Sequence, residues 1–291
     1  MLDYLRATLE NAPPAAASLL LTLVAGGLLW FVHNRLTRFD DHQVLFRDGN
    51  AAYLVQRAAL VLGFGVAALP PTTRTADDLP WSSLIGQAYE LAWVVVAFVA
   101  VRYVVDLVLL RRVANDEELL RGNVALGVVE AGFYLGFGFI LNGSLTGASP
   151  TVTQGLASTV VFGCLGLALV VAVFWLHEAV TPWSIREELR VGGLTAAFEA
   201  AGVLVAVGVV VREGVAGDFT GWVVGFEAFT VTAVVAVLTL YLFRWVANRL
   251  LLRGLTLATI QREHRVVASA FSAVVTVVVA VLVAAVVRTQ L

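Results

Sequence analysis

A block of apolar and small residues from Arg121 to Leu141 constrains the fold of this chain more than any other feature. It reads RGNVALGVVEAGFYLGFGFIL, and after Arg121 it holds a single charged side chain, that of Glu130. A helix needs about 20 apolar residues to cross the ~30 Å hydrocarbon core of a bilayer. We therefore expect this block to form a transmembrane helix with one carboxylate inside it.

Similar blocks recur along the whole chain of 291 residues, of which only 14% are charged. A soluble domain carries about 25% charged residues. The sequence therefore predicts an all-α polytopic membrane protein that is surrounded by the lipid bilayer and has eight transmembrane helices. These are expected at residues 15–36, 50–69, 82–110, 123–142, 152–177, 192–211, 222–245 and 265–287.

The segment before the first block carries an apolar stripe of Leu2, Leu5 and Leu9. A short amphipathic stripe of this kind is typical of a helix that lies on the membrane surface. We expect the helix to end at Pro13 and Pro14, because proline lacks the N–H group that a helix interior needs.

Arginine is distributed unevenly between the two sets of loops. The loops after the first, third, fifth and seventh blocks hold 12 arginines, whereas the opposite face holds four. Loops rich in basic residues stay in the cytoplasm. The sequence therefore predicts the cytoplasmic (inner) membrane as the location, with both chain termini outside.

The blocks pair into four two-helix units. Before the second helix of each unit comes an arginine-rich connection, and most of these connections also carry a cluster of acidic residues. Because each unit crosses the membrane twice, successive units have the same orientation and are parallel repeats about axes along the membrane normal. We divide the chain into a first four-helix half, 1–145, and a more diverged second half, 146–291. Asn50 and Asn123 stand at the entry of the second helix in the first two units.

The entry sequences Asp48-Gly49-Asn50-Ala51-Ala52 and Gly122-Asn123-Val124-Ala125, each followed by a glycine-rich helix, carry a resemblance to a known family. The chain resembles the domain of unknown function 350 family of prokaryotic inner-membrane proteins, in a duplicated form. Gly192-Gly193 replaces the asparagine in the third unit. The resemblance implies a bacterial or archaeal cytoplasmic membrane and brings no catalytic residues with it.

Charged side chains inside the predicted helices are the candidate functional residues, since each costs roughly 2.5–3.5 kcal/mol to insert. Counted from the entry residues Asn50, Asn123 and Gly192, the charges Arg57, Glu130 and Glu199 each lie seven positions on. Seven residues are nearly two helical turns, which predicts one depth about 10 Å from the cytoplasmic surface. Glu90 and Glu227 form a second predicted tier near the outer surface, and Arg102 and Asp106 are spaced as a local salt bridge.

Two interpretations of these charges stay open. In the functional one, Arg57, Glu130 and Glu199 line a polar cavity for a cation, a proton or a small polar solute. In the structural one, Arg57 pairs with Glu130 or Glu199, and the remaining carboxylates pin neighbouring helices together. One arginine cannot neutralise four glutamates, so the others must be protonated, hydrated or bound to a cation.

The sequence does not predict an enzyme, a cofactor or a metal site. His177-Glu178 lacks the second histidine of a zinc-protease helix, and Cys164 is the single cysteine. A chain without lysine has no phosphate-binding loop of the Walker type. A net charge of -2 gives no basic surface for nucleic acid.

Two functions follow, of which the first is a channel- or transporter-like bundle whose intramembrane carboxylates bind a cation, proton or small polar solute. The second is a non-transporting scaffold in envelope maintenance or stress response that acts through its cytoplasmic loops. The acidic loop clusters Asp40-Asp41, Asp116-Glu117-Glu118 and Glu187-Glu188 are expected to be solvated. On the second interpretation they dock a cytoplasmic protein or a polycation, and either function is compatible with a homo-oligomer.

Overall fold

The computed structural model describes residues 2–37, 39–69, 82–111, 115–252 and 254–288, and within these residues all regular structure is helical. The long helices are α1 (Leu2–Leu36), α2 (Ala51–Ala67), α3 (Ser82–Val104), α5 (Val124–Ser144), α6 (Val152–Val180), α8 (Leu194–Val215), α9 (Trp222–Leu251) and α11 (Val266–Arg288). The short helical segments are η1 (Gln43–Arg47), η2 (Val105–Leu109), α4 (Asn115–Leu120), α7 (Ile185–Arg190) and α10 (Leu257–Arg262). The predicted all-α class is confirmed.

Each of the eight predicted blocks corresponds to one long helix. Within the described residues, seven of these helices are long and apolar enough to cross a membrane. The predicted block 50–69 corresponds to α2, which has 17 residues and a length of about 26 Å. The chain is therefore a multi-pass membrane protein, and the eighth crossing stays a prediction.

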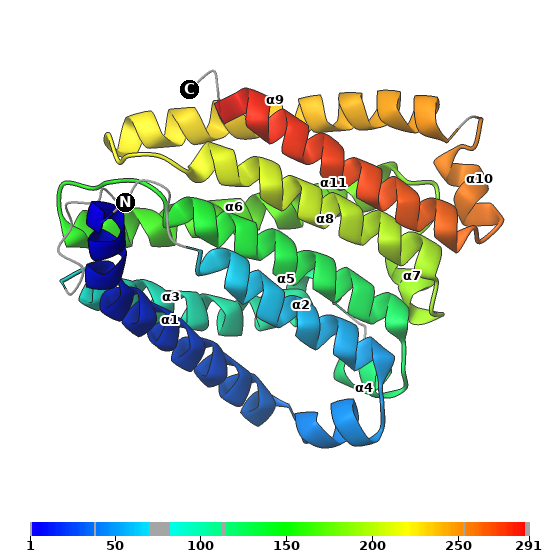
Figure 1. Ribbon diagram of the computed structural model, residues 1–291. Helices are drawn as coiled ribbons and strands as arrows, with labels where there is room; N and C mark the ends of the chain where they lie inside the picture. The colour runs from blue at the N-terminus through cyan, green and yellow to red at the C-terminus, as the bar shows by residue number, and fades with distance from the viewer. Residues whose placement is uncertain (1, 38, 70–81, 112–114, 253, 289–291) are drawn as a thin grey trace.

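The second helices of the four units form a row. Figure 1 shows α2, α5, α8 and α11 side by side in that order and running in the same direction, and their closest packing is between successive members. The shared direction agrees with parallel units. Each unit is displaced sideways from the previous one, whereas we expected an arrangement about an axis normal to the membrane. The segments η1, α4, α7 and α10 gather at one end of the row, which we call the short-helix end.

Glycine allows the helices of the row to touch backbone to backbone. Gly138 in α5 lies against Gly63 in α2, and Gly208 in α8 lies against Gly136 in α5. A Cβ atom at Gly138 would be 2.4 Å from the Gly63 carbonyl oxygen, and one at Gly208 would be 2.3 Å from that of Gly136. No side chain fits at such distances, so small residues set the spacing of the row, as they do in other membrane helix pairs.

The two entry asparagines connect successive units. The Asn50 side chain caps α2 by accepting from the Tyr53 N–H, and it donates to the Leu119 carbonyl at the end of α4, 2.8 Å away. Asn123 repeats both contacts one unit later, since it caps α5 and donates over 2.8 Å to the Leu189 carbonyl of α7. Each asparagine therefore starts its own helix and holds the short helix of the next unit.

Replacing Asn123 by alanine should lower the free energy of unfolding by about 1–3 kcal/mol, because it removes a helix cap and an inter-unit hydrogen bond. Asn123→Asp separates the two roles, since an aspartate keeps the capping acceptor and replaces the donor to Leu189 by an oxygen that the Leu189 carbonyl repels. The check is chemical unfolding of the purified proteins in detergent micelles. Equal stability of Asn123→Ala and the wild-type protein would contradict this role.

The predicted end of the first helix at Pro13 and Pro14 is wrong. Both prolines lie inside α1, which runs on to Leu36 and bends near its N-terminal end (Figure 1). Proline removes a backbone hydrogen bond and kinks a helix without necessarily ending it. The apolar block that follows supplies the span Ala12–Leu36 and continues the helix.

Candidate functional site

The predicted charges Arg57, Glu130 and Glu199 lie near the short-helix end, within the first two turns of α2, α5 and α8. They are 1%, 2% and 4% exposed, so all three are buried among helices. The residue that caps α8 is Gly193, not Gly192. Glu199 is therefore six residues beyond its cap, whereas Arg57 and Glu130 are seven residues beyond theirs. One residue turns a side chain by about 100° around the helix, so Glu199 faces different neighbours.

Arg57 is held by partners from α1, from the loop that follows it and from its own helix. Its Nε lies 3.1 Å from Oδ2 of Asp41, and its Nη2 donates to Oδ1 of Asp41 over 3.2 Å. The Nη1 atom of Arg57 lies 3.2 Å from Nδ1 of His33, and its Nη2 atom also donates to the Tyr53 hydroxyl. That hydroxyl in turn donates to Oδ1 of Asp41 over 2.5 Å. In the described structure neither Glu130 nor Glu199 pairs with Arg57, so the pairing that the structural interpretation expects is not formed.

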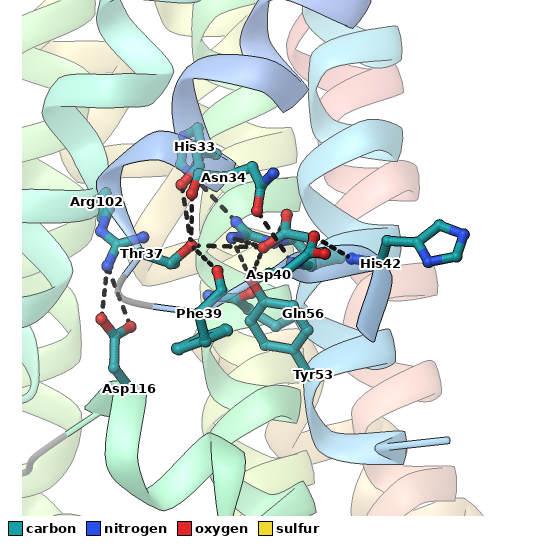
Figure 2. Close-up of polar contacts among 12 residues, drawn as sticks. His33, Asn34, Thr37, Phe39, Asp40, His42, Tyr53, Gln56, Arg102 and Asp116 are labelled. Atoms are coloured by element: carbon teal, nitrogen blue, oxygen red, sulfur yellow. Dashed lines mark hydrogen bonds and ion pairs between the residues drawn. The ribbon is translucent and has the colours of Figure 1, made fainter. Parts of the chain in front are cut away.

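Asp41 is the counter-ion that the sequence interpretation missed. We expected Asp40 and Asp41 to be solvated together, yet Asp40 is exposed and Asp41 is buried. The chain after α1 folds back over the bundle here, and Asn34 accepts a hydrogen bond from the Asp41 N–H over 3.0 Å. Figure 2 shows this turn, with Thr37 donating within it and Tyr53 reaching up from α2.

Arg102 connects α3 to α4. The predicted salt bridge with Asp106 is present at 4.0 Å between Nε and Oδ2. The closer partner is Asp116, whose two carboxylate oxygens accept from Nη2 over 2.8 and 3.1 Å (Figure 2). Asp106 in turn accepts from Asn115 over 2.7 Å. Asp116 therefore belongs to a buried arginine, not to a purely solvated acidic cluster.

Arg244 of α9 is the partner of Glu199. The two side chains form an ion pair, and both are buried. His177 of α6 lies beside them, with its Nε2 3.9 Å from Oε1 of Glu199. This group joins α6, α8 and α9, and its arginine received no role in the sequence interpretation.

Arg102 and Arg244 occupy equivalent places in the two halves, because each lies 13 residues before the first residue of the following short helix. Their counter-ions come from different elements. Asp116 lies 14 residues after Arg102, and the equivalent position after Arg244 is Ala258. Six residues beyond the helix cap, α2 has Gln56 and α8 has Glu199. The closest carboxylate to this equivalent arginine thus comes from the following short helix in the first half and from α8 in the second half, and aligning the two arginines in the sequence would have revealed the exchange.

Glu130 differs from the other buried carboxylates. Its Oε2 accepts from the Gln56 amide over 2.8 Å, and its Oε1 has no hydrogen-bond partner. Among the residues that the structure describes, Glu130 forms no ion pair. The side chain is therefore a buried acid with one neutral partner and one free oxygen.

The two outer carboxylates do not occupy matching places. Glu90 is half-buried and lines a cleft at the opposite end of the row from the short helices, between α3, α6 and the turns 145–149 and 216–221. Glu227 is exposed on α9. Glu90 precedes Arg102 by 12 residues and Glu227 precedes Arg244 by 17 residues, a difference of about 7.5 Å along the helix. The single outer tier that we expected is not formed.

Comparison with known proteins agrees with this architecture. The model of a family described as Domain of Unknown Function (DUF350) matches residues 7–148 and again residues 151–287, as expected of a duplicated form. A UPF0719 transmembrane protein of Aquifex aeolicus (strain VF5) is 24% identical over 191 residues, which are 65% of this chain and 70% of that protein. No solved structure matches the chain.

Proposed function

We propose that this chain, which belongs to the DUF350 family, is a channel- or transporter-like membrane protein that binds a proton or a small cation at Glu130 and catalyses no reaction. The observation that carries the proposal is the environment of Glu130. This carboxyl group is 2% exposed, and one of its oxygens has no hydrogen-bond partner. Ionisable groups inside membrane helices are rare, and their default interpretation is functional.

The three arginines that are buried among the described residues strengthen this assignment because each has its own acid. Asp41, Asp116 and Glu199 neutralise Arg57, Arg102 and Arg244 respectively. Of the four glutamates predicted inside the membrane, Glu130 and Glu199 are buried, and only Glu130 has no arginine partner among the described residues. An isolated buried carboxylate is costly, and a proton or a cation that neutralises it removes this cost.

The position of Glu130 suits a switch between two bound states. Gln56, its neutral partner, can donate to a carboxylate through its amide N–H₂ or accept from a protonated carboxyl through its carbonyl oxygen. Glu130 lies in α5, which packs against α2 and α8 at the centre of the row. A change of charge at this point acts on both halves of the bundle.

The Glu130→Gln variant tests the proposal. We expect the purified wild-type protein to be stabilised by one cation or by a change in pH, and to dissipate the corresponding gradient in proteoliposomes. A ligand at 100 times its dissociation constant contributes about 2.7 kcal/mol. Glu130→Gln should fold, because glutamine has the same shape, and should lose both the stabilisation and the flux.

Glu227→Gln is the matched control, since it makes the same chemical change at an exposed carboxylate. Infrared difference spectra between two pH values add a direct readout, because a carboxyl band that disappears only in Glu130→Gln reports proton binding at this side chain. Identical spectra, stabilisation and flux in the wild-type protein and Glu130→Gln would overturn the assignment.

One observation favours the alternative of a non-transporting scaffold. The acids Glu117 and Glu187 at the short-helix end are both 69% exposed and make only surface pairs with arginines of their own short segments. Surface pairs of this kind contribute little to stability, so their charge is available to a partner. A wild-type protein without ligand-dependent stability or flux would support this second function.

A further inference from the structure

A cleft of about 560 Å³ opens at the short-helix end of the second half. It lies between the C-terminal ends of α6 and α9 and residues 254–258, which lead into α10. Its walls are largely apolar and include Val180, Leu255 and Trp245. Val180 and Trp245 are largely exposed, so the mouth of the cleft faces the surroundings of the bundle near a predicted membrane surface.

Polar atoms without partners gather in this cleft. His177, Trp183, Tyr241 and Arg244 all line it. Both ring nitrogens of His177, the indole N–H of Trp183, the hydroxyl of Tyr241 and Nε of Arg244 are buried and have no hydrogen-bond partner. Buried polar groups are nearly always satisfied, and each exception requires an explanation. Here the unsatisfied groups are mostly donors, and they belong to side chains that line one cleft.

The first half lacks these features at the equivalent positions. Trp183 lies six residues after His177, and the residue six positions after His33 in the first half is Phe39. Tyr241 lies three residues before Arg244, and the residue three positions before Arg102 is Val99. The acid that holds Arg102 corresponds to Ala258, which lines the cleft. At these positions the second half therefore has two donors that the first half lacks, and it lacks one carboxylate that the first half has.

The excess of donors selects an acceptor-rich ligand. Arg244 shares its charge with Glu199, and Arg249 adds a second, exposed cation to the lining. Arginine, tyrosine and tryptophan donors suit an oxyanion, and arginine matches phosphate in particular. The apolar walls suit a hydrocarbon portion attached to that anion.

We propose that this cleft binds a phosphate group of an amphipathic molecule, with Arg244, Tyr241 and Trp183 donating to its oxygens. Such a phosphate can come from a phospholipid headgroup or from a soluble phosphate compound. The proposal is independent of Glu130, which lies in α5 and does not line the cleft.

The test measures the thermal stability of the purified protein in detergent with three probes. These are dihexanoyl phosphatidic acid, inorganic phosphate, and dihexanoylglycerol as a phosphate-free compound with the same chains. Stabilisation by phosphatidic acid alone identifies a lipid headgroup as the source, and stabilisation by inorganic phosphate as well identifies a general phosphate site. Equal stabilisation by dihexanoylglycerol, or none by either phosphate probe, would overturn the proposal.

Two variants place the effect in the cleft. Tyr241→Phe should weaken phosphate binding about tenfold, the factor that one hydrogen bond to a charged group supplies, whereas Tyr103→Phe, at an exposed tyrosine of α3, should leave it unchanged. Ala258→Asp restores the carboxylate of the first half and should abolish binding by pairing with Arg244. Unchanged affinity in both Tyr241→Phe and Ala258→Asp would contradict the assigned position.

Discussion

Substitution of Arg57 by methionine is expected to lower the free energy of unfolding by about 3–5 kcal/mol, the cost of removing one partner from a buried ion pair. Asp41 and Tyr53 are almost fully buried, and Arg57 is the cation that both contact. Methionine is similar in length and leaves Asp41 as an uncompensated charge. The loss would be measured by chemical unfolding in detergent micelles.

The double variant Arg57→Met/Asp41→Asn should recover most of this loss, because it removes both charges, and asparagine keeps the shape of Asp41. Replacing a whole buried pair by neutral groups is often close to neutral. Arg121→Met is the matched control, since Arg121 is 67% exposed and pairs with Glu117 and Glu118 at the surface, where a pair contributes less than about 1 kcal/mol. A double variant no more stable than Arg57→Met would show that the charge of Asp41 is not the cause.

The second half of the chain supports this reasoning. At the positions equivalent to Asp41, Tyr53 and Arg57 it has Ile185, Ala196 and Ala200, all fully buried. The same fold is therefore built once with a buried polar trio that contains an ion pair, and once with an apolar trio. The three residues change together, as expected for groups that satisfy one another and cannot be left alone.

The sequence predicted the positions of the helices well, and it predicted the ion-pair partners of the buried charged residues poorly. The apolar blocks gave every long helix to within a few residues at most ends, because the cost of unpaired backbone groups in lipid forces each block into a helix. The single large miss, the continuation of α1 through Pro13 and Pro14, depended on what followed the prolines, not on the prolines themselves.

The charged site shows the opposite balance. Arg57, Glu130 and Glu199 were predicted as buried charges and are buried. Their partners Asp41 and Arg244 were not found, because pairing depends on how the loop after α1 folds back and on a one-residue offset in α8. Neither feature is visible in hydropathy. An alignment of the two halves at Arg102 and Arg244 would have identified Arg244 as the partner of Glu199.

Gly208→Leu is expected to destabilise the protein by at least the ~1–3 kcal/mol that extra methylenes cost in a packed core, and to disturb the row itself. A Cβ at this position would lie 2.3 Å from a backbone oxygen of Gly136, which cannot rotate away as a side chain can. The helices α5 and α8 would have to separate, and with them the two halves of the chain.

Gly65→Leu provides the control from within the molecule. Gly65, Gly138 and Gly208 occupy the same position in their helices, 15 residues beyond the cap. Gly138 packs on Gly63 and Gly208 packs on Gly136, and each contacted glycine lies 13 residues beyond the cap of the preceding helix in the row. Because α2 is the first helix of the row, a Cβ at Gly65 meets nothing within 4 Å. Thermal unfolding in detergent should therefore show Gly65→Leu close to wild type, and Gly208→Leu far below it. Equal effects of the two substitutions would mean that glycine at this position serves the helix itself and not the spacing of the row.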